Sequence, residues 1–106
     1  MYNNNIDVDY LMNKIQTITN NEQLRLQEFR KKIYKSCILK INNSIDCAIT
    51  DVFYSVPCKT KEYPKYDPFE CLIYIQNKLR KKNFETLIIE KDNMIFVSWN
   101  HIVNKK

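Results

Sequence analysis

The sequence of 106 residues predicts an α+β domain in which helices pack on a three-stranded antiparallel sheet. The first observation is a well-capped helix that begins after Asp67. The second is a pair of apolar strands, joined at Asp92-Asn93, that follows this helix directly. The third is a β-branched and aromatic segment before Pro57. Together they predict the order α-α-β-α-β-β in a single domain, distantly similar to a winged helix.

Two helices are expected at the N-terminal end, after a frayed segment over residues 1–5. A short helix is predicted over about residues 9–18, because Leu11, Ile15 and Ile18 stand at helical spacing. Asn20-Asn21 is expected to interrupt this helix and to cap a second one over about residues 22–42. The apolar stripe of the second helix consists of Leu26, Phe29, Ile33, Cys37 and Ile41.

The central part of the sequence predicts a strand, a loop and a third helix. Residues 47–56 are rich in β-branched and aromatic types, and the following polar loop carries Tyr63 and Tyr66. In the helix over residues 67–82, Asp67 is the expected N-cap and Pro68 suits the first turn. Basic residues gather at its C-terminal end, where they are favoured by the helix dipole. Asn83 is a suitable left-handed terminator.

The hairpin is expected over residues 84–90 and 94–99, with residues 102–106 frayed. A two-residue turn would pair Ile89 with Phe96 and Ile88 with Val97. Both faces of the hairpin are then apolar, so one face is expected in the core and the other partly exposed or in a dimer contact. The strand that ends at Trp99 is a candidate edge for pairing with another chain.

Nothing in the sequence predicts a catalytic, metal or cofactor site, and we expect neither enzymatic activity nor a small-molecule substrate. The four cysteines, at positions 37, 47, 58 and 71, have irregular spacing, so we expect free thiols rather than disulfides or a zinc site with His101. Ser98 and His101 are three residues apart on an expected strand and so should face opposite ways.

No apolar run is long enough to cross a membrane, and the N-terminus lacks a signal-peptide pattern. We therefore expect a protein that is neither secreted nor transmembrane, remains in the compartment where it is made and has no membrane partner.

Several segments resemble a short domain of unassigned function from nucleocytoplasmic large DNA viruses. The resembling segments are residues 54–57, 64–67, 71–75, 79–84 and 94–99, about half of the chain. Asn83 stands where that family usually has glycine, a mild departure because both residues adopt left-handed backbone. The resemblance implies a viral protein located in the host cytoplasm or the virion, with a role as a virion component among the expectations, and it carries no catalytic residue.

Two functions follow as hypotheses. The preferred one is a structural or protein-interaction module that binds a viral or host protein, or itself as a homodimer. Its expected contact residues are Tyr63, Tyr66, Ile88, Val97 and Trp99. The alternative is nucleic-acid binding in a winged-helix-like manner, in keeping with the net charge of +5. Its expected contact residues are Lys78, Arg80, Lys81 and Lys82.

Overall fold

The computed structural model describes residues 7–103, and the expected fraying of residues 1–5 and 104–106 lies outside this range. The elements are α1 (Val8–Asp46), β1 (Asp51–Ser55), α2 (Pro68–Lys81), β2 (Glu85–Ile89), a 3-10 turn (Glu90–Asp92), β3 (Met94–Ser98) and α3 (Asn100–Val103). The α+β class and the three-stranded antiparallel sheet are confirmed. Residues 102 and 103, expected to be frayed, belong to α3.

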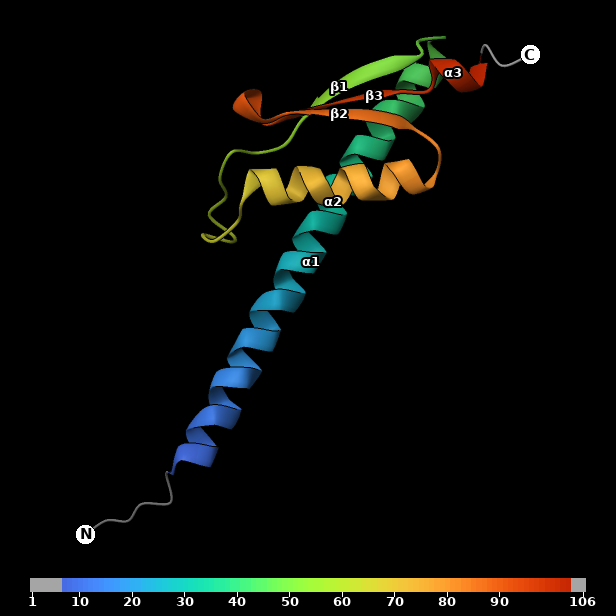
Figure 1. Ribbon diagram of the computed structural model, residues 1–106. Helices are drawn as coiled ribbons and strands as arrows, with labels where there is room; N and C mark the ends of the chain where they lie inside the picture. The colour runs from blue at the N-terminus through green and yellow to red at the C-terminus, as the bar shows by residue number, and fades with distance from the viewer. Residues whose placement is uncertain (1–6, 104–106) are drawn as a thin grey trace.

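The sheet has the strand order β1-β3-β2, with antiparallel pairing throughout. Figure 1 shows that α1 and α2 lie on the same side of the sheet, and neither of these helices covers the other side. The inner side carries alternate residues of each strand, among them Val52, Ile95 and Val97. These side chains pack on Leu72 and Ile75 of α2 to form the core.

α1 is one helix of 39 residues rather than two, so the predicted break at Asn20-Asn21 is wrong. Helix propagation costs little once a helix is anchored, and two asparagines lower propensity without blocking the backbone hydrogen bonds. The side chain of Asp7 caps the N-terminus of α1 by accepting a hydrogen bond from the Tyr10 backbone N–H at 2.9 Å. We call residues 8–21 the arm, since every one of them is exposed, and residues 22–103 the head.

The predicted start of α2 is confirmed. Asp67 is its N-cap, with Oδ1 accepting a hydrogen bond from the backbone N–H of Phe69 at 3.0 Å, and Pro68 occupies the first turn. Asn83 has a φ of 70°, as its predicted role as a left-handed terminator requires. α2 therefore delivers the chain directly into β2, as the sequence indicated.

The predicted hairpin register is wrong by two residues. Ile89 pairs with Met94 and Ile88 with Ile95, because a short 3-10 turn that ends at left-handed Asn93 replaces the tight turn. A shift of two residues preserves the side on which each side chain lies, so the predicted faces hold. β3 is the central strand, so it is not the exposed edge that we expected; β1 and β2 are the edges.

Candidate interaction surfaces

The side of the sheet away from the helices carries a row of three apolar side chains, one from each strand. Phe53 of β1 and Leu87 of β2 both lie opposite Phe96 of β3. The rings of Phe53 and Phe96 are 5.0 Å apart between centroids. Phe53 is 48% exposed and Leu87 is 60% exposed, which is unusual for large apolar residues on a sheet. Together with Ile89 and Met94 of the next row, these residues define the outer face.

The other face of the hairpin packs in the core, and this corrects two predicted contact residues, Val97 and Trp99. Val97 is fully buried, Trp99 is 6% exposed and packs edge-on against Phe84, and Ile88 packs against the core. In the folded chain the side chains of Val97 and Trp99 are not available to a partner, and Ile88 is only partly exposed. The hairpin does have one buried and one partly exposed face, as expected. The partly exposed face is the one with Leu87 and Phe96, not the one that carries the predicted contact residues.

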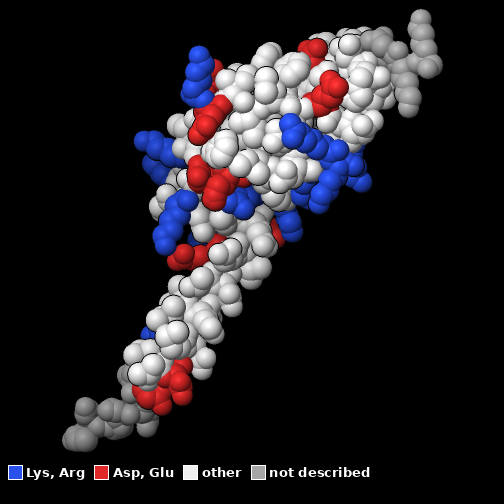
Figure 2. Space-filling model, in the orientation of Figure 1, with Lys and Arg blue, Asp and Glu red and all other residues white. Residues whose placement is uncertain are grey.

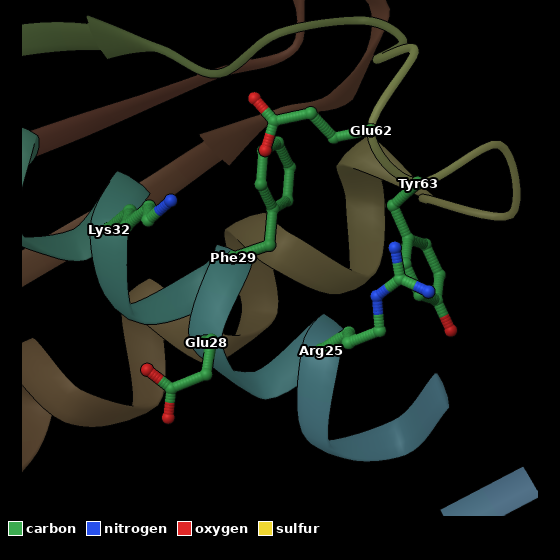
Figure 3. Close-up of a pocket in the computed structure, with 6 residues that line it drawn as sticks. All are labelled: Arg25, Glu28, Phe29, Lys32, Glu62 and Tyr63. Atoms are coloured by element: carbon green, nitrogen blue, oxygen red, sulfur yellow. The ribbon is translucent and has the colours of Figure 1, made fainter. Parts of the chain in front are cut away.

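The loop over residues 56–67 also differs from the prediction in part. Tyr66 is buried, with its ring at 5.2 Å from Phe29 in an edge-to-face contact, so its assignment as a partner residue is corrected. Tyr63 is partly exposed and lines a pocket of about 330 Å³ between α1 and the loop. Figure 3 shows that the pocket is lined by four side chains of α1 and two of the loop. The lining residues are Arg25, Glu28, Phe29, Lys32, Glu62 and Tyr63.

This pocket has an amphipathic wall, with two basic and two acidic side chains around two aromatic rings. A second, adjoining hollow extends it along the loop towards Pro64. There Lys65 Nζ lies 3.7 Å from Glu22 Oε2, an exposed ion pair of small energetic value. The mixed charges favour no particular ligand class.

The basic residues proposed for nucleic-acid contact are partly engaged within the chain. The Nζ atom of Lys78 lies over the rings of Tyr34 and Tyr74, at 5.3 and 5.4 Å from their centroids. Arg80 donates from Nε to Thr86 Oγ1 and from its terminal nitrogen to the Thr86 carbonyl oxygen. Lys81 and Lys82 are exposed at the end of α2, where the helix dipole favours positive charge.

Ser98 and His101 make separate contacts. Ser98 Oγ accepts a hydrogen bond from the Asn100 backbone N–H. His101 Nε2 donates to the Asn83 carbonyl oxygen at 2.8 Å, and its Nδ1 lies 3.8 Å from a Glu85 carboxylate oxygen. These contacts tie α3 to the connection between α2 and β2, which is a structural role.

The four cysteines are free thiols in two environments. Cys47 and Cys58 are exposed, whereas Cys37 and Cys71 are fully buried between α1 and α2. Burial raises the pKa of the Cys37 thiol to about 12 and also raises the pKa of Cys71. Burial raises the pKa of Tyr66 as well, whose hydroxyl lies beside the Cys71 thiol. These groups stay protonated and unreactive at neutral pH.

Within residues 7–103, no three His, Cys, Asp or Glu side chains gather in a way that would hold a metal ion. None of the helices described is both long and apolar enough to span a membrane. Comparison with known protein families, characterised proteins and solved structures finds no match to this chain. The resemblance to a domain of large DNA viruses therefore stays a prediction from the sequence.

Proposed function

We propose that this chain is a non-enzymatic protein-interaction module whose head binds another protein through the outer face. The observation that carries the proposal is the row of Phe53, Phe96 and Leu87 on the side of the sheet that α1 and α2 leave uncovered. Exposed apolar patches of this kind commonly mark protein contacts. Aromatic residues at the centre of such a patch contribute most to binding when they are desolvated.

The charges around the outer face indicate the chemistry of the partner. Asp51 and Glu85 lie on this side of the sheet, in the row next to Phe53 and Leu87. At the other end, the turn between β2 and β3 carries Glu90 and Asp92 on either side of Lys91, so its net charge is also negative. An apolar centre with an acidic rim fits a protein surface that has an apolar centre and a basic rim. The same rim repels phosphates, which disfavours nucleic acid on this side.

The proposed setting is viral, and it rests on the sequence resemblance alone. In that setting the module is a structural component that contacts a viral or host protein, with the virion as one location.

The test is affinity capture of partners by the full chain in the cells that produce it. The variant Phe53→Glu with Leu87→Glu should lose its principal partner, because two charges enter the apolar centre of the contact. The matched control is Asn42→Glu with Asn77→Glu, which adds the same charge to exposed helix positions and should keep the partner. Thermal unfolding should confirm that both variants fold.

Two results would contradict the proposal. One is that the outer-face variant, while folded, retains every partner of the unmodified chain. The other is tight binding of generic duplex DNA that weakens steeply with salt and is lost when Arg80, Lys81 and Lys82 are neutralised. That second result would favour the nucleic-acid alternative.

A further inference from the structure

The arm carries an apolar stripe that nothing in the described chain covers. Val8, Leu11, Ile15 and Ile18 follow the three- and four-residue spacing of a coiled-coil seam. They are 71%, 46%, 55% and 52% exposed, respectively. The stripe lies on the same side of α1 as Phe29 and Ile33, which pack in the core of the head. One continuous stripe is therefore packed in the head over its second half and exposed over its first half. Figure 1 shows the first part of α1 projecting away from the other elements.

A bare arm is a marginal helix. Residues 17–21 read Thr-Ile-Thr-Asn-Asn, and all of these types have lower helix propensity than alanine or leucine. Helices draw most of their stability in proteins from the packing of an apolar face. The arm lacks such packing against residues 7–103, so a second helix on its stripe would supply the apolar contacts that stabilise it as a helix.

The head determines which way a second copy can approach. From Phe29 onward the stripe side of α1 packs into the core of the head, and the loop already lies beside Glu22 and Arg25. Two parallel copies with their stripes facing each other would bring both heads into the same space. Antiparallel copies instead place the packed part of each head, from Phe29 onward, beyond the tip of the other arm.

The charges along α1 favour the same orientation. The tip carries Asp7 and Asp9, and Lys14 is the sole basic residue from position 7 to 21. Over residues 22–32, four basic residues exceed two acidic ones. Figure 2 shows acidic side chains at the described end of the arm and the basic side chains concentrated on the head. An antiparallel pair brings each acidic tip to the basic base of the other arm, whereas a parallel pair brings the two tips together.

We propose that the arm binds the arm of a second copy of this chain as an antiparallel two-helix coiled coil. Ile15 of one copy then packs against Ile18 of the other, and Val8 reaches the level of Arg25. This contact uses a surface other than the outer face, which stays free on both heads. The homodimer thus presents two outer faces at opposite ends.

The test is sedimentation of the full chain over a range of concentrations. The unmodified chain should be a dimer, with a dissociation constant below about 100 μM. Leu11→Glu with Ile15→Glu should make it monomeric, since glutamate preserves helix propensity but charges the seam. Asn13→Glu with Asn20→Glu adds the same charge on the opposite side of the arm and should leave the dimer intact.

Orientation is tested by disulfide trapping in a Cys47→Ser, Cys58→Ser background. With Val8→Cys and Arg25→Cys combined, the antiparallel pair should form bonds between positions 8 and 25 of different copies. Bonds joining 8 to 8 and 25 to 25 would overturn the orientation. A monomer at every concentration, or a dimer that survives the Leu11 and Ile15 substitutions, would overturn the proposal. Neither of these outcomes bears on the outer face.

Discussion

At the scale of single residues, the left-handed backbone positions of this chain are occupied by residues other than glycine. The sequence contains none, yet Ala48, Asn83 and Asn93 all have positive φ. Asparagine adopts this conformation readily, so the two asparagines suit their positions at the end of α2 and in the hairpin turn. Ala48, with a φ of 62°, carries a Cβ that crowds the backbone where α1 gives way to β1.

Ala48→Gly should therefore stabilise the chain by about 1 kcal/mol, because glycine removes the steric cost of the left-handed backbone. Urea unfolding measures the change. Asn83→Gly serves as the control and should change the free energy of unfolding by much less. Equal effects at both positions would mean that Ala48 carries no strain.

A second prediction at this scale concerns pH. The Cys37 thiol has a pKa of about 12 in the folded chain, against about 8.5 when unfolded. The folded state therefore holds the proton more tightly. The protonated Cys37 thiol therefore makes its full contribution to the free energy of unfolding below about pH 8.5. This contribution is lost as pH rises towards 12, by up to about 1.4 kcal/mol per pH unit.

Urea unfolding between about pH 8 and 10, with reductant present, should show this loss. Cys37→Ala should lower the overall stability but flatten its alkaline slope. Cys47→Ala, at an exposed thiol, should leave the slope unchanged. A slope in Cys37→Ala as steep as in the unmodified chain would show that Cys37 does not cause the loss.

At the scale of elements, the sequence predicted those features that depend only on residues close together in the chain. The cap, first turn and terminator of α2 lie within the element itself, and all three were predicted from the sequence. The break at Asn20-Asn21 was also a local signal, but the length of α1 depends on cooperativity along the whole helix. The hairpin register depends on the backbone of the turn, where left-handed Asn93 permits a longer connection than the two-residue turn.

The cap of α2 gives the prediction at this scale. Asp67→Ala removes the acceptor of the Phe69 N–H and should cost about 0.5–2 kcal/mol of unfolding free energy. Asp67→Asn keeps a capping oxygen and should cost far less. Chemical denaturation of the three proteins decides the matter, and a fully stable Asp67→Ala chain would argue against the cap.

At the scale of the whole molecule, the candidate surfaces were only partly predictable. The sequence indicated two apolar hairpin faces but not which of them α1 and α2 would cover. Phe53 was not predicted as a contact residue. The alternation of β1 shows that it lies on the other face of the sheet from Val52 and Tyr54, but its place in the apolar row depends on the pairing of β1 with β3. Leu11, Ile15 and Ile18 were recognised as a helical stripe. Their exposure could not be predicted, because it depends on α1 being one continuous helix that extends beyond the rest of the fold.

Small-angle X-ray scattering combined with a mass measurement tests the account at this scale. A compact fold of this length has a radius of gyration near 13 Å, whereas a single chain with its arm extended has 19.8 Å. We expect the mass of two chains, a radius well above 19.8 Å and a pair-distance distribution with two separated maxima from the two heads. The mass of one chain, or a radius near 13 Å, would contradict an arm that joins two heads.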